Sequence, residues 1–383
     1  LLAGRVARAG AARAPLVAGV RPERIPLSYA QRRLWFAFRL EGPSPTYNCP
    51  LVLRFSGPLD REALAGAVAD VVARHESLRT RFVELDGEPC QQVIPVGDAR
   101  VVVDGPRPVA GEEELDRLLR EHSAYRFDLA AEIPFRATLF EQAPDQHVLL
   151  LLVHHIASDG WSMTPLARDL STAYRTRTHG QNLDQGQELA PLAVQYADYA
   201  LWQTAVLGNP HDPNSILARQ RTYWTHQLTG APQVLDLPLD RPRPAIARHH
   251  GATTPLTLTP ALHHQLRTLA RDHDVTLFMV LHAATAVLLR TLGAGTDLPI
   301  ATVQAGRTDE ALEPLVGFFV NTLILRTDLT GDPTFTELLT RVRETDLAAY
   351  AHQDLPLDHV IEALNPHRTL SHTPFTQIAL TLQ

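Results

Sequence analysis

Two adjacent histidines, followed by an aspartate and a glycine, are the residues of this chain with the clearest chemistry. His154 and His155 open the heptapeptide HHIASDG, which ends in Asp159 and Gly160. An imidazole titrates near neutral pH, so one of these histidines can move a proton at pH 7. Two other His-His pairs, at 249–250 and 263–264, lack Asp and Gly at the same offsets. The heptapeptide is therefore the predicted catalytic segment.

Other kinds of chemistry find little support in the sequence. GxSxG, a P-loop and GxGxxG are all absent. No further His, Cys or Asp set has zinc spacing, and adjacent strand side chains point to opposite faces, so both histidines rarely bind one ion. We therefore expect no metal and no resident cofactor. What remains is direct acyl transfer, in which one His positions an amine and accepts its proton. Such general-base catalysis raises a reaction rate about 10²–10⁴-fold.

The carboxylate of Asp159 is expected to hold the loop rather than attack a substrate. A carboxylate at a buried strand end needs a cationic partner. Arg79 and Arg326, each on a predicted strand, are the candidates. Gly160 leaves the loop without a side chain, so a substrate can pass close to the backbone. The alternative interpretation of the histidines is a purely structural pair at a strand end.

The elements that must position this segment are strands and helices in alternation. The apolar run at 148–153 predicts a buried strand that leads into His154, paired with a strand at 134–140. Ser162 and Pro165 favour the start of a helix after it. Further helices are predicted at 28–40, 60–75, 112–125, 192–207, 215–228, 261–273, 276–292, 335–350 and 357–364. Further strands are predicted at 51–55, 78–83, 91–96, 253–258, 298–303, 322–327 and 375–382. This alternation indicates an α/β or α+β fold.

Length and composition limit the class of protein. A chain of 383 residues is too long for one ordinary core and predicts two domains. Its 45% hydrophobic and 20% charged residues are typical of a globular protein. A net charge of −7 argues against a nucleic-acid partner, and no apolar stretch reaches 18 residues, so no membrane span is expected. Two cysteines, Cys49 and Cys90, fit a reducing cytoplasm.

A polar segment divides the chain. Residues 176–188 contain Gly180 and Gly186 and read as a linker, which predicts a first lobe at 25–178 and a second at 179–383. Residues 1–24 form a basic lead-in without a signal peptide. Both ends of the chain resemble cuts within a longer polypeptide, so we expect residues 1–24 to be a linker or tail.

Six motifs, in order, resemble those of the condensation domains of nonribosomal peptide synthetases. The resemblance covers residues 24–383. The motifs are SYAQRRLW at 28–35, RHESLRTRF at 74–82, HHIASDG at 154–160, YADYALW at 196–202, VGFFVNT at 316–322 with Arg326, and HQDLP at 352–356.

The resemblance implies two chloramphenicol-acetyltransferase-like lobes in a V-shaped pseudo-dimer, with a tunnel between them. The second lobe of the family continues beyond the position of Gln383, so we expect it to be truncated here. His155 would be catalytic, and Asp159 would form a salt bridge with Arg79, or with Arg326 as second choice. The resemblance implies structural roles at the active site for His154 and Gly160. It places Trp202, Asn321 and Ser162 at the tunnel or lobe interface.

The resemblance also implies the reaction and its partners. A downstream aminoacyl amine would attack an upstream aminoacyl or peptidyl thioester, both held on 4′-phosphopantetheine arms of peptidyl carrier domains, with an adenylation domain adjacent. The product would be a peptide secondary metabolite such as an antibiotic, and the lead-in would end an upstream carrier domain. RHESLRTRF, YNCP at 47–50 and HHIASDGWS favour the subtype that accepts an L-configured donor.

Three alternatives stay open. An epimerisation domain shares the HHxxxDG scaffold, although the segments around its glutamate base are not found here. A stand-alone acyltransferase of the wider HxxxDG superfamily would use a free thioester. A docking module would keep the fold without catalysis.

Overall fold

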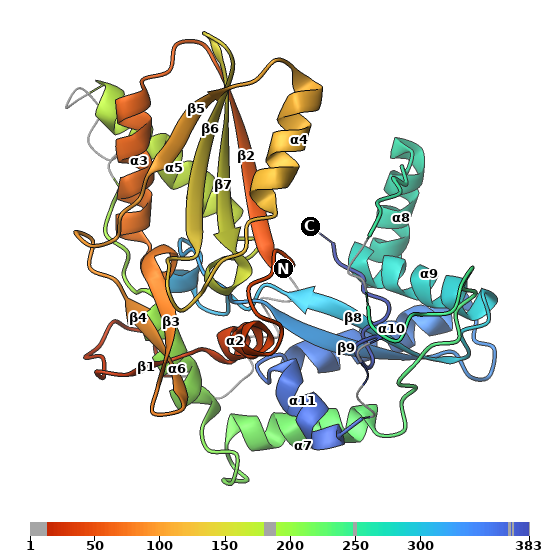
Figure 1. Cartoon of the computed structure of the whole chain (residues 1–383). Coiled ribbons are helices and arrows are strands. Elements are labelled where there is room, and N and C mark those ends of the chain that lie inside the picture. The colour runs from red at the N-terminus through yellow and green to blue at the C-terminus, as the bar shows by residue number, and fades with distance from the viewer. Residues whose placement is uncertain (1–13, 180–188, 248–250, 367–368, 370, 383) are drawn as a thin grey trace. The chain divides into compact units, whose positions relative to one another are not determined.

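The chain folds into two compact units of mixed α/β structure (Figure 1). A computed structural model describes residues 14–179, 189–247, 251–366, 369 and 371–382. We call Ala14–Val206 with Arg307–Val320 the first unit, and Leu207–Gly306 with Asn321–Gln383 the second unit. The chain thus leaves the second unit at Arg307 and returns to it at Asn321.

A four-stranded sheet forms the centre of the first unit, with strand order β2-β7-β6-β5. The bounds are β2 (Asn48–Ser56), β5 (Val103–Pro108), β6 (Phe135–Ala143) and β7 (Gln146–His154). β7 is a central strand, and all its residues after Gln146 are buried, as expected for an apolar strand covered on both faces. The pairs β2–β7 and β6–β7 are antiparallel, and β5–β6 is parallel.

Helices cover both faces of this sheet (Figure 1). α3 (Arg61–Arg74) and α5 (Met163–His179) pack on one face, in a core that includes Val68 and Leu170. α4 (Glu112–Ser123) packs on the other through Leu115, against Phe140 and Leu150. The strand that leads to the histidines is therefore held rigidly on both sides.

A smaller sheet and two further helices complete the first unit. The strands β1 (Ile25–Pro26), β4 (Glu88–Val93) and β3 (Thr80–Leu85) pair in the order β1-β4-β3. The β3–β4 turn has positive φ at Asp86 (52°) and Gly87 (82°), as its Asp-Gly signal predicts. The helices are α2 (Tyr29–Glu41) and α6 (Tyr196–Leu207), with short 3₁₀ turns η2 (Glu76–Arg79), η3 (His155–Ala157) and η5 (Glu310–Leu312).

Helix α2 begins with a capping box at Ser28. Ser28 accepts a hydrogen bond from the Gln31 backbone N–H, and the Gln31 side chain accepts one from the Ser28 N–H. This reciprocal pair satisfies two backbone donors that the helix itself leaves free.

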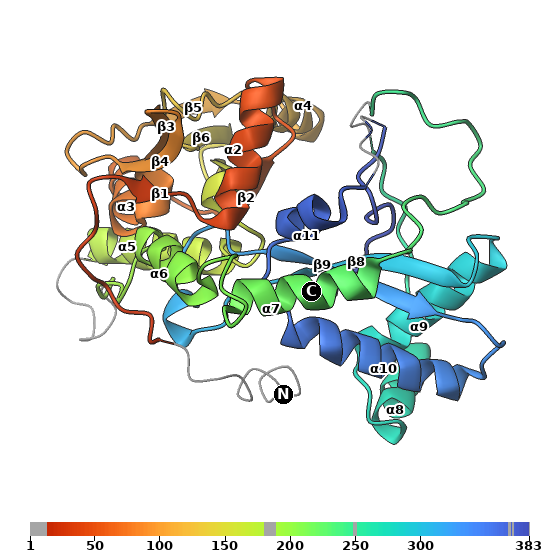
Figure 2. The same ribbon diagram turned by 90° about the horizontal axis from the view of Figure 1, so that it is seen from below.

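The second unit contains a two-stranded antiparallel sheet, β8 (Asp297–Gln304) with β9 (Asn321–Asp328) (Figure 2). Its helices are α7 (Ile216–Leu228), α8 (Pro260–Asp272), α9 (Leu277–Thr291), α10 (Phe335–Ala351) and α11 (Leu357–Leu364). Its core joins residues of α9 and α10, such as Val280 and Val342, to Ile300 of β8. Ala379 forms an isolated parallel bridge with Ala301, which is all that the structure shows of the predicted strand at 375–382.

Some predicted elements differ from the structure. The strand predicted at 253–258 is wrong, because these residues are exposed and form no ladder with any described strand. β5 was not predicted, because its Gly and two Pro residues are atypical of strands and are tolerated only at a sheet edge.

The division into units also differs from the predicted boundary at residue 178. α6 and the segment 307–320 both belong to the first unit. Part of the predicted linker, 176–179, ends α5, and 180–188 lie outside the described residues.

Part of the lead-in packs on the first unit. Residues 1–13 lie outside the described residues, but Leu16 is buried and Arg21 forms ion pairs with Asp198 (2.8 Å) and Glu76 (2.6 Å). The predicted tail of a carrier domain at 1–24 is therefore, from Ala14 on, integrated into this unit.

No single helix among the described residues is long and apolar enough to cross a membrane. α8 and α9 reach that composition only when taken together, and they are bent by 103° at their junction.

Candidate active site

The predicted catalytic histidine lies where the central strand of the first unit ends. β7 ends at His154, and His155 begins the 3₁₀ turn η3. The His155 N–H donates to the Tyr47 carbonyl oxygen just before β2 (2.7 Å), and His154 lies opposite Asn48 in the β2–β7 ladder. The backbone of this turn is thus fixed to the rigid sheet.

The His155 ring is held in one tautomer. Its Nδ1 lies 2.6 Å from the Ser158 carbonyl oxygen. Because a carbonyl oxygen only accepts, Nδ1 carries the hydrogen, and in the neutral ring Nε2 then holds the lone pair. The side chain is partly exposed. His155 therefore presents a basic nitrogen whose orientation is set by the other nitrogen, as a general base requires.

His154 has a different environment. It is buried, and its Nδ1 accepts a hydrogen bond from the Ile156 N–H (3.1 Å). Burial, followed by the charge of His155, lowers the pKa of His154 to about 3. His154 is therefore neutral at pH 7 and caps the turn that carries His155.

The carboxylate of Asp159 is fully buried and pairs with Arg307. Arg307 Nη2 lies 3.2 Å from Asp159 Oδ1, and Asp159 Oδ2 accepts a hydrogen bond from the Phe319 N–H (3.1 Å). Oδ1 also accepts from the backbone N–H and the hydroxyl of Ser162 (2.9 and 2.7 Å). Asp159 therefore organises the loop, as predicted, but with a cation that the sequence did not suggest.

The two predicted partners of Asp159 are wrong. Arg79 donates to the Ile94 carbonyl oxygen (2.6 Å) and lies 3.7 Å from Glu76. Arg326 belongs to the second unit, where it pairs with both oxygens of Asp297 (2.8 and 2.7 Å). Both guanidinium groups are engaged within their own neighbourhood, whereas Arg307 reaches Asp159 across 148 positions of sequence.

Ser162 lies beneath the HHIASDG turn, and its predicted place at the tunnel or lobe interface stays a prediction. Its side chain is completely buried between Asp159, Arg307 and Gly317. The hydroxyl lies closest to the carboxylate and accepts from the Gly317 N–H (3.1 Å). Gly160 is exposed, and a Cβ there would meet no atom within 4 Å, so its predicted role in admitting substrate stays a prediction.

Trp202 and Asn321 both have local structural partners. The Trp202 indole N–H donates to the Ala14 carbonyl oxygen (2.7 Å) in the lead-in. In the second unit, Asn321 Nδ2 donates to the carbonyl oxygens of Gln353 and Leu355 (2.9 and 2.8 Å). Asn321 thereby fastens the HQDLP segment to β9, and the predicted places of both residues at a tunnel stay predictions.

Several residues that organise the site lie inside the quoted motifs, but the sequence did not reveal their roles. His75 Nε2 lies 2.9 Å from Asp169, and its Nδ1 accepts from the Val316 N–H (3.3 Å). Burial lowers the pKa of His75, so it stays neutral. The ring of Phe318 lies against the His155 imidazole, with centroids 4.6 Å apart. Neither contact has a local signal, because each joins residues far apart in the chain.

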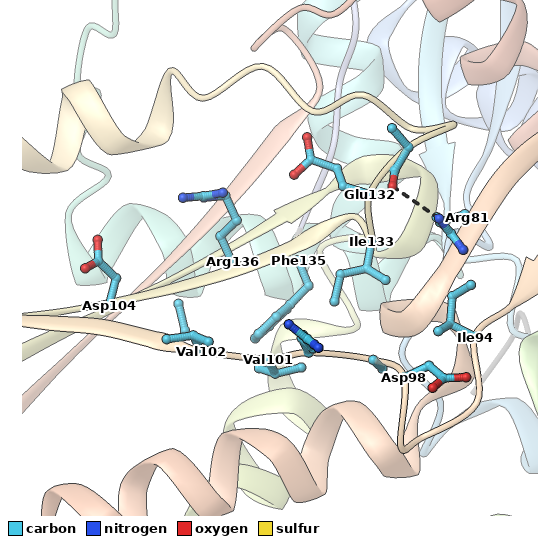
Figure 3. A pocket seen from close by; sticks show the side chains of 14 residues that line it. Arg81, Ile94, Asp98, Val101, Val102, Asp104, Glu132, Ile133, Phe135 and Arg136 are labelled. Atoms are coloured by element: carbon cyan, nitrogen blue, oxygen red, sulfur yellow. Dashed lines mark hydrogen bonds between the residues drawn. The ribbon is translucent and has the colours of Figure 1, made fainter.

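A cavity of about 550 Å³ in the first unit lies apart from this chemistry (Figure 3). Its wall includes Arg81, Glu132, Arg136 and Phe135, and none of residues 154–160 lines it. Within the described ranges, no group of three His, Cys, Asp or Glu residues could hold a metal ion.

Comparisons with known proteins found similar sequences over nearly the whole chain. The family model "Condensation domain" matches residues 22–383. The chain is 53% identical over 363 residues to CymA of Salinispora arenicola, a probable non-canonical nonribosomal peptide synthetase, covering 95% of this chain and 5% of that protein. It is 52% identical over 363 residues to the dimodular nonribosomal peptide synthase of Bacillus subtilis, covering 95% and 15%.

Solved structures agree in fold. The X-domain from teicoplanin biosynthesis, solved alone and in complex with OxyB, is 37% identical, with TM-scores of 0.85 and 0.87. The match covers 96% of this chain and 79% of that one. The chain therefore belongs to the condensation domain family of nonribosomal peptide synthetases, and it spans a small part of the two synthetases that it matches.

Proposed function

We propose that this chain joins two carrier-bound substrates by an amide bond. The observation that carries the proposal is the His155 ring, whose Nδ1–H is fixed by Ser158 while Nε2 has no hydrogen-bond partner among the described residues. A neutral amine of the downstream aminoacyl thioester would attack the carbonyl carbon of the upstream thioester. The C–N bond forms, the amine proton passes to His155 Nε2, the C–S bond breaks, and the leaving thiolate takes up a proton.

Simple energetics favour a lone base for this reaction. An α-amine has a pKa of about 7.7–8, so a useful fraction is already neutral at pH 7. The thioester supplies the activated acyl group, so no nucleophilic side chain is required. The rest of the acceleration comes from holding both substrates in register, which can replace about 7–11 kcal/mol of the barrier.

The finer features of the proposal rest on sequence motifs and relatives. We propose peptidyl carrier domains upstream and downstream, an adjacent adenylation domain, and 4′-phosphopantetheine arms that bring the substrates. The relatives are multidomain synthetases, which supports these partners. The motifs RHESLRTRF, YNCP and HHIASDGWS support an L-configured donor. The free cysteines Cys49 and Cys90 support a reducing cytoplasm, and the nonribosomal peptide synthetases among the relatives support a place in secondary-metabolite synthesis.

A docking module is the second candidate function. The X-domain that shares this fold was solved in complex with OxyB, so the fold can serve to bind another protein. Against it stands the complete base arrangement at His155, which docking alone does not require.

The test is the identity of the product. A panel of L-aminoacyl donor carriers and aminoacyl acceptor carriers is mixed with the full chain, and each carrier is analysed by intact-protein mass spectrometry. We expect a dipeptidyl thioester on the acceptor carrier and an emptied donor carrier. Inverted stereochemistry on one carrier without a new amide would establish an epimerisation domain instead. Carrier binding without product for any pair would favour the docking module.

A further inference from the structure

The segment Val316–Phe319 is bound to the first unit by side chains rather than by a strand ladder. The Val316 N–H donates to His75 Nδ1 (3.3 Å), and the Val316 carbonyl oxygen accepts from the Ser77 hydroxyl (2.7 Å). His75 and Ser77 are both buried. The RHESLRTRF motif thus fixes the beginning of this segment.

The remaining backbone groups bind two other motifs. The Gly317 N–H donates to Ser162 Oγ (3.1 Å), and the Phe319 N–H donates to Asp159 Oδ2 (3.1 Å). The Phe318 carbonyl oxygen accepts from the Tyr196 hydroxyl (2.5 Å). Because the partners are single side chains, each substitution removes one defined attachment.

The Tyr196 hydroxyl is itself oriented. It donates to Phe318, so it can only accept from the Ser28 hydroxyl, which lies 2.8 Å away. Tyr196 is completely buried, which raises its pKa well above 10 and keeps its proton in place. Gly317 makes room for the ring, since a Cβ at residue 317 would lie 2.2 Å from it.

The segment ends at the catalytic histidine. The Phe318 ring packs on the His155 imidazole at 4.6 Å between centroids, while Ser158 holds Nδ1. The main-chain carbonyl that Tyr196 binds belongs to the same residue whose side chain packs on that ring. A shift of Phe318 would therefore release one of the two restraints on His155.

We propose that Tyr196 is a positioning residue for His155, acting through Phe318. Tyr196 reaches no substrate, because it is completely buried. Its hydroxyl fixes the Phe318 backbone, and the Phe318 ring limits rotation of the His155 ring away from Ser158, whose carbonyl oxygen selects the tautomer. This inference rests on the proposed function for its kinetic consequence, but its effect on the His155 ring does not depend on substrate.

The chain offers a matched pair of variants. Tyr196→Phe removes the hydroxyl that binds Phe318, and Tyr199→Phe removes a hydroxyl that accepts from Gln203. Both rings lie on α6 and pack on Phe319, with centroids 5.0 and 4.9 Å from it. Each substitution therefore removes one hydroxyl from a buried tyrosine ring on α6. Only Tyr196→Phe removes the hydrogen bond to the Phe318 carbonyl oxygen.

The first measurement is the state of the His155 ring without substrate, by NMR of chain carrying ¹⁵N-labelled histidine. The chain has 18 histidines, so the His155 signals are assigned by their loss in His155→Asn. We expect wild type and Tyr199→Phe to show one tautomer protonated at Nδ1, and Tyr196→Phe to show exchange between two. The inference is overturned if folded Tyr196→Phe keeps the wild-type ring signals, or if Tyr199→Phe changes them equally.

The second measurement is the single-turnover rate of amide formation. Tyr196→Phe should lower the rate at saturating carrier about tenfold, since small misplacement of a catalytic group is costly, and leave half-saturation by the acceptor carrier unchanged. If no amide forms with wild type, the proposed function fails, while the ring measurement still decides the role of Tyr196.

Should Tyr196→Phe not fold, Ser28→Ala removes the donor to the same hydroxyl and must shift the His155 ring signals in the same direction. Unchanged signals in folded Ser28→Ala would then overturn the inference.

Discussion

His154 and His155 are adjacent in the sequence and differ in almost every physical respect. His154 is buried with its Nδ1 bound to a backbone N–H, and His155 is partly exposed with its Nδ1–H bound to a carbonyl oxygen. The first arrangement requires a neutral ring and the second leaves a base. At the scale of single residues, hydrogen-bond polarity thus gives His154 a structural role and leaves His155 the candidate base of the proposed reaction.

The buried histidine predicts an acid-sensitive stability. In the unfolded chain a histidine has a pKa of about 6.5, and in the fold burial lowers the pKa of His154 to about 3. Between these values the unfolded state binds more protons, so the free energy of unfolding falls as pH decreases from about 6.5 to about 3. His154 should contribute up to about 1.4 kcal/mol per pH unit to this fall. Urea unfolding at several pH values measures it.

His154→Asn is the appropriate control. Its side-chain oxygen can still accept from the Ile156 N–H, but it does not titrate. We expect the variant to show a flatter dependence of unfolding free energy on pH than the wild type below pH 6.5. Parallel curves for the two proteins would mean that His154 is charged, or exposed, in the native state.

The sequence revealed the candidate catalytic segment but not the partner of its aspartate. HHIASDG was visible because all its residues are local. Arg307 lies 148 positions from Asp159, in no quoted motif, and only the path of segment 307–320 brings it close. Arg79 and Arg326 carry the right charge to pair with Asp159, but each binds a partner closer in the sequence. Arg79 binds the Ile94 carbonyl oxygen, and Arg326 binds Asp297. Residue type and spacing predict which group needs a counter-charge, and the fold decides which one it receives.

At the scale of elements, β7 and the segment 307–320 position the site in different ways. β7 carries the histidines on a strand buried on both faces, and segment 307–320 closes on them through side-chain hydrogen bonds. Arg307 anchors the start of the segment by donating to the Leu315 carbonyl oxygen (3.0 Å) and by pairing with Asp159. The turn of HHIASDG and this segment should therefore lose stability together.

Removal of Arg307 tests that coupling. Arg307→Met leaves the buried carboxylate of Asp159 without its cation and should cost about 3–5 kcal/mol in the free energy of unfolding. Asp159→Asn in the same chain removes the unpaired charge, so the double variant should be less destabilised than the sum of the two single variants. Chemical denaturation of the four proteins gives the coupling energy. Strict additivity would show that the two groups do not interact in the native state.

Elements with strong local signals were predicted well. The helix predicted at 28–40 and the paired strands β6 and β7 follow their patterns. The strand predicted at 253–258 failed because alternation of apolar residues describes a strand face and supplies no partner for its backbone. β5 was missed for the opposite reason, since pairing with β6 at an edge tolerates a Pro- and Gly-rich sequence.

At the scale of the whole molecule, the chain crosses between its units more than once. The first unit includes 14 residues, Arg307–Val320, that come from between β8 and β9 of the second unit. A division by linker composition could not foresee this exchange, because the segment has no unusual composition. The V arrangement of the two lobes stays a prediction of the family resemblance.

The coding sequence on either side of this chain tests the proposed partners. The relatives are synthetases of which this chain spans 5% and 15%. The proposed function predicts a carrier domain encoded just upstream and an adenylation domain just downstream. Such an arrangement would also supply the native carriers for the product assay.

The most direct test of the account is the rate of amide formation when His155 loses its imidazole. With a carrier pair that the wild-type chain condenses, His155→Ala should lower the single-turnover rate at least ~10²-fold, as expected for loss of a general base. His211→Ala, an exposed histidine of the second unit, should leave the rate unchanged. A folded His155→Ala chain that still forms the dipeptidyl thioester at the wild-type rate would contradict the claim that this one imidazole carries the chemistry.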